Sequence, residues 1–483
     1  MTGPAGPVIG TRTGAEAASI VPLATTLLVG AIAALLDTTI VAVALDQLRH
    51  DLDATVTAIQ WVTTSYVLAM TAVIPVVGWS VGRFGARRMW VSALGLFLAG
   101  SVLSGLAWSA TALIAFRVLQ GLGGGMILPL TQLIVAREAG PERFGRVMGV
   151  VGLAGQLAPV SGPVLGGLLI DTWGWRWVFL VNIPIVLISL TMTWRWFPRD
   201  EHRSGQPLDV VGLLLLPAAV VALIYALSSL EAALSGRPAG SVAALVVGAA
   251  LLTAFVVRSR RRGAASLIDP GLFRDRSLRG ATMMMFVLGV TTWGPMLLFP
   301  LYFQQLRGLS ALDAGFALAP QSIGLGLAFL VVGRYTDRVA PRPVAAAGLT
   351  VATAATVPFV FATDHSDLRM LGLALFVRGL GLGVASLPVS VALYTTLRPT
   401  AVPGATSAST VVQRVGAACG TALTAVILQA SGFASALTWM LVFTAAALAA
   451  SALLPGRAPA RPGCLERQPR AVDEQPSTKS IHP

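Results

Sequence analysis

The chain has 483 residues, of which 55% are hydrophobic and only 11% are charged, and its mean hydropathy is +0.77. Soluble domains carry about 25% charged residues, so this composition excludes an ordinary soluble protein and predicts a polytopic membrane protein. The net charge of +13 is spread over the connecting segments, which argues against a nucleic-acid partner, and the two cysteines, Cys419 and Cys464, cannot form a disulfide framework.

Apolar runs recur along the whole chain, and many reach the roughly 20 residues that a spanning helix needs. The N-terminal stretch MTGPAGPVIGTRTGAEAAS lacks the charged start and the cleavage site of a signal peptide, so we expect the first run to be retained as a helix. About fourteen runs are expected, near residues 22–45, 56–79, 89–109, 111–135, 147–170, 176–197, 209–230, 238–257, 280–303, 313–333, 344–363, 368–393, 405–430 and 434–454.

Basic residues predict the orientation of these helices. About 26 Lys and Arg residues fall on the side that holds both termini and about 5 on the other. The connection DQLRHDLDAT after the run 22–45 is acidic, whereas RSRRRGAASLIDPGLFRDRSLRG after the run 238–257 is strongly basic. The positive-inside rule therefore predicts a multi-pass protein of the cell membrane with both termini in the cytoplasm.

Two parts of the chain carry matching motifs. GWSVGRFGARR begins at Gly78 and GRYTDRVAPR begins at Gly333. RVLQGLGGG in the run 111–135 is similar to FVRGLGLG in the run 368–393. Such a repeat predicts parallel halves related by an axis along the membrane normal. The expected domains are an N-terminal six-helix half (1–200), inserted helices 7 and 8 (201–262), a C-terminal six-helix half (263–455) and a disordered cytoplasmic tail rich in Pro, Arg and Gln (456–483).

These motifs resemble the major facilitator superfamily, and more narrowly its fourteen-helix drug:proton antiporters of the multidrug efflux type. LDTTIVAVAL from Leu36 is similar to the family's helix 1 motif, RVLQGLGGG from Arg117 to its helix 4 motif, and GPVLGG from Gly162 to the helix 5 motif of antiporters. WRWVFLVNIPI, LIDPGLFRDRS, PLYFQQLRGLSALDAG and QRVGAACGTA agree with the fourteen-helix branch. The resemblance implies an all-α integral membrane protein with the major facilitator fold, acting as a monomer by alternating access on small molecules and protons.

The chain departs from the family pattern at several positions. Gly82 stands where the loop between helices 2 and 3 normally carries an acid, Ala42 and Asp46 replace the usual Asn and Pro of helix 1, and Ala158 replaces a common Gly. Gly82 therefore supplies no charge to the usual charge clamp between the halves. The gating-loop residues that the resemblance assigns are Gly78, Arg83, Gly85, Arg87, Gly333, Asp337 and Arg338.

Asp37 is the only acid expected deep within a spanning helix, where a charge costs several kcal/mol. Burial disfavours the charged form of a carboxylate and a nearby cation favours it, so such a group can take up a proton on one side and release it on the other, or pair with a cationic substrate. Alternatively, Asp37 lies in a wet vestibule or in a permanent ion pair. Arg117 on helix 4 is its natural partner, and the family implicates this arginine in proton coupling; the alternative is a structural arginine bound to backbone carbonyls.

Four residues are candidates for the substrate cavity. Gln120 lies one turn from Arg117 on the same helix face, where it lines the site or packs. Arg378, deep in helix 12, attracts an anionic or zwitterionic substrate or pairs across the halves. Trp293 and Tyr66 offer stacking and cation–π contacts, although membrane aromatics also form interfacial belts.

Glycines on helix 5 form the motif that the family associates with antiport: Gly149, Gly162, Gly166 and Gly167, with Pro163 among them. Small residues four apart let helix backbones approach closely, and a proline permits a kink. Packing alone explains these residues, but a tight contact between helix 5 and the second half would also seal one face of the protein and limit leak.

Several functional classes are disfavoured. The chain has no G-x-x-x-x-G-K-[ST] motif, so ATP hydrolysis is not expected to drive transport. No metal-ligand cluster, cofactor motif or nucleophile–base pair emerges, which disfavours an enzyme. The leading interpretation is a proton-coupled exporter of small, largely apolar or cationic compounds such as drugs or antibiotics. The alternatives are an exporter dedicated to one endogenous metabolite, an importer or uniporter, which GPVLGG disfavours, and a non-transporting sensor.

Overall fold

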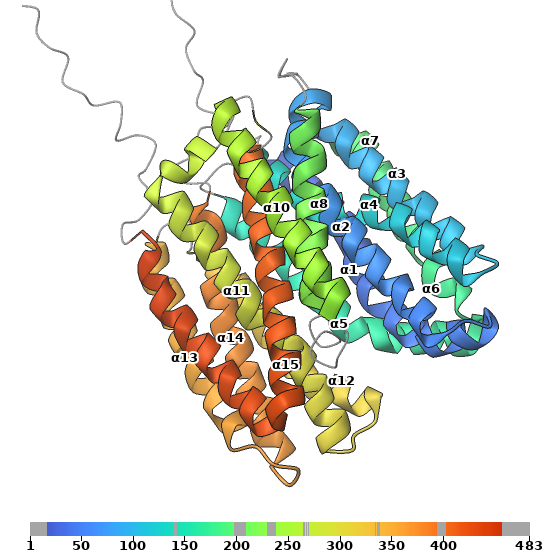
Figure 1. Ribbon diagram of the computed structural model, residues 1–483, viewed down its shortest axis with the longest axis vertical. Helices are drawn as coiled ribbons and strands as arrows, with labels where there is room; N and C mark the ends of the chain where they lie inside the picture. Colours follow the sequence, from blue (N-terminus) through green and yellow to red (C-terminus); the bar gives the residue numbers. More distant parts are fainter. Residues whose placement is uncertain are drawn as a thin grey trace, which may run out of the picture.

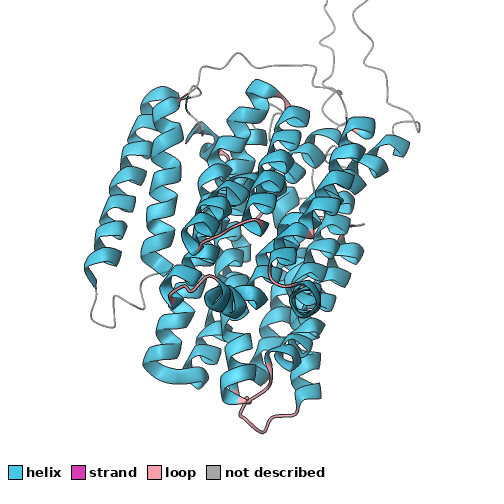
Figure 2. Cartoon of the chain, turned by 90° about the vertical axis from the view of Figure 1, so that its right-hand side faces the viewer, coloured by secondary structure: helices cyan, strands magenta, loops and turns pink. Residues whose placement is uncertain are grey.

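A computed structural model shows a helical bundle, and it describes residues 17–139, 143–197, 209–228, 238–263, 266, 268, 270–333, 335, 339–393 and 402–455 (Figures 1 and 2). No strand occurs among them. The helices are α1 (Ala17–Asp51), α2 (Val56–Phe84), α3 (Ala86–Gly105), α4 (Ala110–Glu138), α5 (Phe144–Trp173), α6 (Arg176–Leu180), α7 (Asn182–Trp196), α8 (Val210–Ser228), α10 (Pro238–Arg262), η2 (Pro270–Arg274), α11 (Arg276–Leu301), the π-helical turn η3 (Tyr302–Leu306), α12 (Ala311–Val332), α13 (Pro341–Val360), α14 (Leu368–Ala392), α15 (Val402–Ala450) and η4 (Ser451–Leu453).

Local capping explains where several helices begin. The side chains of Thr55, Ser109 and Ser310 accept hydrogen bonds from backbone amides in the first turns of α2, α4 and α12. Such caps satisfy donors that have no partner within the helix. Gly85 joins α2 to α3 with φ of 94°, a conformation that favours glycine. This expected gating residue therefore forms the turn between two helices.

All of the expected apolar runs fall on helices, and twelve candidate membrane spans lie among the described residues. The difference from the expected count of about fourteen has two sources. The described apolar part of α5, Phe144–Leu153, is too short to count, and α15 counts once although it carries two expected runs. The expected all-α membrane fold is confirmed, with the sixth run divided between α6 and α7.

The long helix α15 turns back on itself. Gly432 breaks it with φ of 76° and ψ of −177°. Ala405, near the start of α15, and Leu454, just beyond its end, share one apolar cluster with Leu278 at the start of α11. Ala436, beside the break, belongs to the cluster at the opposite end of α11. The two halves of α15 therefore cross the bundle in opposite directions, as two separate passes.

The bundle consists of two groups of helices and an added pair. Helices α1–α7 share apolar clusters with one another, as do α11–α15. Helix α8 packs against both α2 and α15, and α10 packs against α8 on the outside of the bundle, at the left of Figure 2. The inserted pair thus covers a seam between the two groups. The domain limits expected from the sequence stay a prediction, and the tail 456–483 lies outside the described residues.

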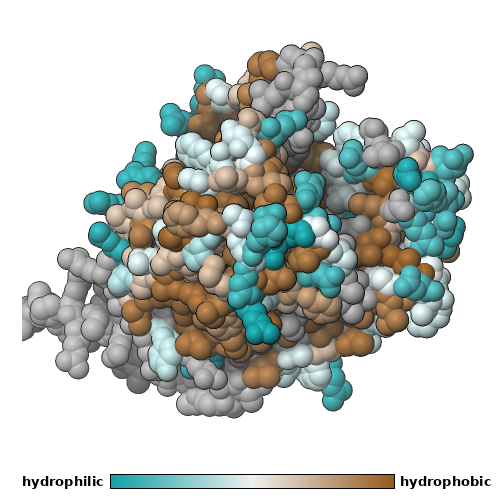
Figure 3. Space-filling view, turned by 90° about the horizontal axis from the view of Figure 1, so that it is seen from below, coloured by the Kyte–Doolittle hydropathy of each residue, from teal (hydrophilic) through white to brown (hydrophobic). Residues whose placement is uncertain are grey.

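The two groups meet at one end of the bundle and diverge toward the other (Figure 1). At the closed end the backbone amide of Gly78 on α2 donates to the Ser407 hydroxyl on α15 over 3.2 Å. The described residues nearest both chain ends also lie here, since Leu23 packs with Phe197 and Leu454 with Leu278. Figure 3 views the opposite end, where polar side chains interrupt an apolar surface.

Candidate functional site

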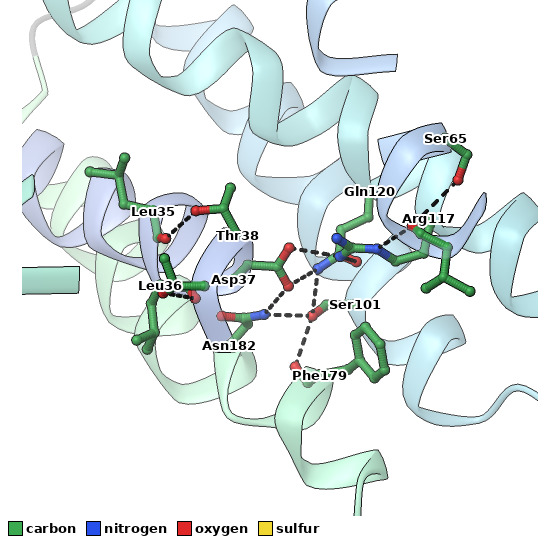
Figure 4. A network of polar contacts seen from close by, with 12 residues as sticks. Leu35, Leu36, Asp37, Thr38, Ser65, Ser101, Arg117, Gln120, Phe179 and Asn182 are labelled. Carbon is green, nitrogen blue, oxygen red and sulfur yellow. Dashed lines mark hydrogen bonds and ion pairs between the residues drawn. The ribbon is translucent and has the colours of Figure 1, made fainter. Parts of the chain in front are cut away.

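Asp37 and Arg117 form an ion pair inside the N-terminal half. Arg117 Nη1 lies 2.7 Å from Asp37 Oδ2, and the two side chains are 1% and 0% exposed. Asp37 comes from the middle of α1 and Arg117 from the first half of α4, and Figure 4 shows the two side chains pointing toward each other. The structure therefore brings together the two residues predicted for proton coupling and excludes the wet vestibule for Asp37 in this conformation.

Two amide side chains complete the shell around the carboxylate (Figure 4). Gln120 Nε2 donates to Asp37 Oδ1 over 2.8 Å, and Gln120 Oε1 accepts from Arg117 Nη1 over 2.7 Å. Asn182 Nδ2, at the start of α7, also donates to Asp37 Oδ1, over 3.1 Å. An ionised carboxylate accepts hydrogen bonds and donates none, so three donors around Asp37 match its charged form.

Ser101 on α3 holds the two amides in place. Its hydroxyl oxygen accepts from Asn182 Nδ2 over 3.0 Å and from Gln120 Nε2 over 3.2 Å, and it donates to the Phe179 carbonyl over 2.8 Å. Ser101, Gln120 and Asn182 are all 0% exposed. The site is a closed network in which α1, α3, α4 and α7 each supply at least one polar side chain.

Arg117 is also fixed by aromatic and backbone contacts. Its guanidinium carbon lies 3.8 Å from the centre of the Tyr66 ring, a cation–π contact, and its Nε donates to the Val62 carbonyl over 3.4 Å. Glycines on α4 make room for this arrangement, because a Cβ at Gly124 would lie 2.8 Å from the Tyr66 hydroxyl and one at Gly121 would lie 2.6 Å from the Tyr66 carbonyl. The glycine-rich stretch of α4 thus serves the site by letting α2 approach.

Tyr66 and Gln120 were expected to line a substrate cavity, but the structure buries both side chains beside Arg117. Tyr66 is 1% exposed beneath Arg117, and Gln120 bridges the ion pair. Both face inward because each satisfies or covers a buried charge, which exposure to a cavity would undo. In this conformation they belong to the Asp37 network.

Arg378 occupies a different environment on α14 in the C-terminal half. It is 0% exposed, its Nη2 donates to the Thr291 carbonyl over 3.0 Å, and its Nη1 donates to Gln321 Oε1 over 3.2 Å. Its guanidinium carbon lies 5.4 Å from the centre of the Phe299 ring. No described carboxylate pairs with it, so the ion pair across the halves considered from the sequence is not formed by the described residues.

Trp293 is 37% exposed on α11 and faces a second arginine. The guanidinium carbon of Arg414, on the first half of α15, lies 5.8 Å from the centre of the Trp293 ring. Arg414 is partly buried on α15, which packs against α2 of the other half. Sequence reasoning missed Arg414, although a guanidinium within the apolar run 405–430 was itself a signal.

The antiporter-motif glycines on α5 face two different neighbours. A Cβ at Gly149 would lie 2.5 Å from the Phe329 carbonyl of α12, in the C-terminal half, whereas Cβ atoms at Gly162 and Gly166 would meet α1 at Thr39 and Ile40. The expected contact with the second half is therefore made at Gly149, and the later glycines pack α5 against α1 because α5 crosses both. A Cβ at Gly167 would meet no atom within 4 Å, and nothing is described for the Pro163 side chain.

The gating-loop residues lie at the closed end of the bundle. Gly78 bonds to Ser407, Gly333 lies against α5, and Arg87 Nη2 donates to the Trp194 carbonyl of α7 over 3.1 Å. Arg83 is exposed. Asp337 and Arg338 lie outside the described residues, so their expected role stays a prediction.

Ser101 and Asn182 were also missed from the sequence. Asn182 was visible within FLVNIPI, where a buried amide in an apolar run is costly unless it is hydrogen-bonded, but Ser101 gave no comparable signal. Within the described part of the chain, no three His, Cys, Asp or Glu side chains gather as metal ligands.

Two groups of membrane-spanning helices, one of which encloses a buried carboxylate–arginine pair, are typical of helical membrane transporters. The Major Facilitator Superfamily family model matches residues 27–322 and 281–480. The chain belongs to this superfamily.

Individual relatives agree with this assignment. The chain is 39% identical over 394 residues to a multidrug resistance protein B homolog of Mycobacterium tuberculosis (strain ATCC 25618 / H37Rv), covering 81% of this chain and 73% of that protein. It is 30% identical over 410 residues to the methylenomycin A resistance protein of Streptomyces coelicolor, covering 84% and 85%. The crystal structure of the human organic anion transporter MFSD10 (TETRAN) superposes with a TM-score of 0.65 over 89% of this chain and 99% of that one, at 15% identity, a likeness of fold alone.

Proposed function

We propose that the protein is a proton-coupled exporter of small organic compounds, of the multidrug efflux type, working by alternating access. The observation that carries the proposal is the Asp37–Arg117 pair, sealed from solvent and surrounded by neutral amides. The names of the relatives, which are resistance proteins for several drugs and for methylenomycin A, support efflux as the direction of transport.

Protonation of Asp37 would break the ion pair and leave Arg117 without its counter-charge. Removing one partner from a buried pair costs about 3–5 kcal/mol, which is enough to change the preferred arrangement of the surrounding helices. The segment of α1 that carries Asp37 packs directly on α5, because Thr39 meets Gly162. Helix α5 in turn contacts α12 at Gly149. This chain of contacts offers a physical route from the proton site to the interface between the halves.

The available energy is sufficient for useful export. One proton moving down a potential of 100 mV yields about 2.3 kcal/mol before any pH gradient is added. That energy permits roughly fifty-fold accumulation per proton, since 1.4 kcal/mol corresponds to a factor of ten. No nucleotide is required.

The proposal includes the placement of the protein. Both termini are assigned to the cytoplasm, because about 26 basic residues lie on the side of the termini and about 5 on the other. The protein is proposed to act in the cell membrane as a monomer. A fluorescent protein that matures only in the cytoplasm, fused after Pro483, is expected to fluoresce. A reporter active only outside the cytoplasm is expected to work when inserted near Asp51. The reverse pattern would contradict this orientation.

A second candidate is an exporter dedicated to one metabolite, favoured by the likeness to the methylenomycin A resistance protein. A drug-susceptibility panel in a strain without its own pumps separates the two. Protection against many unrelated compounds supports the multidrug type, and protection against one supports a dedicated exporter.

Purified protein in liposomes under an imposed pH gradient tests the coupling. Asp37→Asn keeps the shape of the side chain but cannot change its charge, so we expect it to fold and to lose proton-driven efflux. Asp37→Glu should retain partial activity. Asp51→Asn is the matched control, because Asp51 ends the same helix and is exposed. Substrate–proton exchange by Asp37→Asn at the wild-type rate would place the proton site elsewhere.

A further inference from the structure

Helix α10 is the most exposed of the candidate spans in the described part of the chain. Only 17% of its apolar window is buried, because the helix lies outside the bundle and packs mainly on α8 (Figure 2). The rest of its surface would face lipid in a membrane. The span Ala239–Arg262 ends in the sequence RSRRR, which places its guanidinium groups at the depth where lipid headgroups begin.

A pocket of about 700 Å³ lies along one face of α10, and this volume is typical of ligand sites. Residues three or four positions apart share a face of a helix, so its lining forms a single stripe. The Thr253 hydroxyl in this stripe already donates to the Ala249 carbonyl of its own helix. The stripe is therefore apolar over about 10 Å and ends in positive charge. Its apolar part is lined by Ala250, Thr253, Ala254 and Val257, and its charged end by Arg258, Arg261 and Arg262.

The charged end of the pocket is only partly neutralised by the protein. Asp209 Oδ1 lies 2.9 Å from Arg258 Nη2 and 3.2 Å from Arg262 Nη1, so one carboxylate serves two guanidinium groups. Arg261 is exposed and forms no ion pair within the described ranges. Like charges three or four residues apart on a helix repel each other. Three positive charges and one negative charge leave a net charge of +2 beside the apolar stripe.

Asp209 also holds two of these guanidinium groups in place. The carboxylate is 2% exposed and accepts from Arg258 Nε over 3.0 Å and from Arg258 Nη2 over 2.9 Å, whereas the side chains of Arg258 and Arg262 are 28% and 43% exposed. A guanidinium has five N–H donors, and Arg262 uses one of them on Asp209. The remaining donors are available to an outside acceptor. Planar guanidinium groups fixed in this way suit phosphate oxygens, which accept two parallel hydrogen bonds.

We propose that this pocket binds an anionic phospholipid whose headgroup carries two phosphate groups, of the diphosphatidylglycerol class. The phosphates would lie against the three arginines, and one acyl chain would lie along residues 250–257. Two negative charges match the net charge of +2, and basic pockets beside membrane helices bind such headgroups. The tail 456–483 is a poorer match, because it has five basic and three acidic residues. The lipid site does not depend on proton coupling; only its placement in the cytoplasmic leaflet rests on the proposed orientation.

Three lipids with the same oleoyl chains test the headgroup: a diphosphatidylglycerol, a phosphatidylglycerol and a phosphatidylcholine, which carry two, one and no net negative charges. Native mass spectrometry of the purified full chain in detergent measures the affinity for the first bound lipid. The affinity should fall in that order by about fivefold at each step, a factor that corresponds to about 1 kcal/mol for each charge.

Two neighbouring arginines locate the site. Arg261→Gln removes an exposed charge that lines the pocket, so the chain should fold as before and the affinity for the diphosphatidylglycerol should fall by about fivefold. Arg260→Gln is the matched control, because Arg260 is exposed one position earlier and is not among the lining residues. It should change the affinity by less than about twofold. A general attraction between basic residues and anionic lipid would make the two variants equal.

The apolar stripe distinguishes a lipid from free phosphate. Ala254→Trp fills part of the pocket without changing its charge, and should lower the affinity for the lipid by about fourfold, the factor for one methylene that no longer packs. Ala249→Trp makes the same change at an exposed position of α10 outside the pocket, and should leave the affinity unchanged. Inorganic phosphate added in excess at constant ionic strength should not displace the lipid.

Equal affinity for the charged and neutral lipids, equal losses in Arg260→Gln and Arg261→Gln, or no loss in Ala254→Trp would overturn the proposal. Displacement of the lipid by inorganic phosphate would show a site for free phosphate instead. Liposome transport separates this inference from the proposed function. Selective lipid binding without proton-driven flux supports the lipid site and refutes antiport, whereas proton-driven flux without a headgroup preference supports antiport and refutes the lipid site.

Discussion

Gly149 on α5 lies directly against Gly333 at the end of α12, where a Cβ on Gly333 would come within 3.4 Å of the Cα of Gly149. The two glycines belong to different motifs, one assigned to antiport and the other to a gating loop. Their contact joins the halves at the end of the bundle where Gly78 also bonds to Ser407. The two motifs therefore form parts of one closed interface.

A bulky residue at Gly149 should open this interface. A Cβ there would already lie 2.5 Å from the Phe329 carbonyl, which is backbone and cannot rotate away, so Gly149→Leu must push α5 from α12. Spin labels on α5 and α12 should report a longer distance, and transport should fall. Gly167→Leu makes the same substitution on the same helix where a Cβ meets nothing within 4 Å, and should change neither quantity. An unchanged distance in Gly149→Leu would refute this account of the closed end.

The buried Asp37–Arg117 pair should make the loss of one partner more destabilising than the loss of both. Arg117→Gln leaves the Asp37 carboxylate buried without a cation, so the free energy of unfolding should fall by about 3–5 kcal/mol. Adding Asp37→Asn removes that uncompensated charge and should recover at least about half of the loss, although transport stays absent. Reversible unfolding in mixed micelles measures both variants. A double variant less stable than Arg117→Gln would show that the carboxylate does not depend on Arg117.

Much of this architecture follows from the sequence because the length of each apolar run can be read from a short stretch of the chain. Each expected run falls on a helix. The pairing of Asp37 with Arg117 was predicted from the family resemblance, in which both helices line the cavity, and from the cost of an unpaired buried guanidinium. Gly432 reverses α15 without a loop of its own. The expected runs 405–430 and 434–454 are divided at this glycine, so the two passes were expected from the sequence.

The surroundings of the charge pair could not be predicted in the same way. Ser101 and Asn182 act through hydrogen bonds between helices that are far apart in the sequence, and such pairs leave no periodic pattern. Tyr66 looked like a cavity aromatic, but it packs under Arg117 because Gly121 and Gly124 open a space that only the folded bundle reveals.

The inserted helices should be sensitive to the charge of Asp209. This side chain, 2% exposed just before α8, lies 2.9 Å from Arg258 and 3.2 Å from Arg262 of α10. Burial opposes ionisation, but the hydrogen bonds from the Gly212 amide and Arg258, with the charges of both arginines, outweigh it and hold the pKa of Asp209 below its ordinary 3.8. A lowered pKa in the folded state means that the stabilisation is complete above pH 3.8 and is lost as the pH falls through the lower, folded value.

We therefore expect Asp209→Asn to speed amide hydrogen exchange at the start of α8 and the end of α10 at pH 7. Arg258→Gln should do the same, since it removes the shorter ion pair. Arg260→Gln is the control, because Arg260 is exposed on the same helix and has no ion-pair partner among the described residues. Equal exchange in all three variants would show that the ion pairs do not hold α8 and α10 together.

The last prediction uses two buried serines one turn apart on α3. Ser101 accepts hydrogen bonds from Gln120 and Asn182, whereas the hydroxyl of Ser104 is buried with no partner among the described residues. Ser101→Ala removes the acceptor that orients both amides toward Asp37, and a lost hydrogen bond of this kind is worth about 1 kcal/mol. Without this acceptor both amides are free to turn away from Asp37, so the rate of proton-driven efflux should fall. Ser104→Ala, which loses no hydrogen bond, should keep the wild-type rate. The measurement is the initial rate of proton-driven efflux in liposomes under a constant pH gradient. Equal rates for the two variants would mean that the amide shell only packs around Asp37, whereas a loss confined to Ser101→Ala would show that the shell supports the function of the carboxylate.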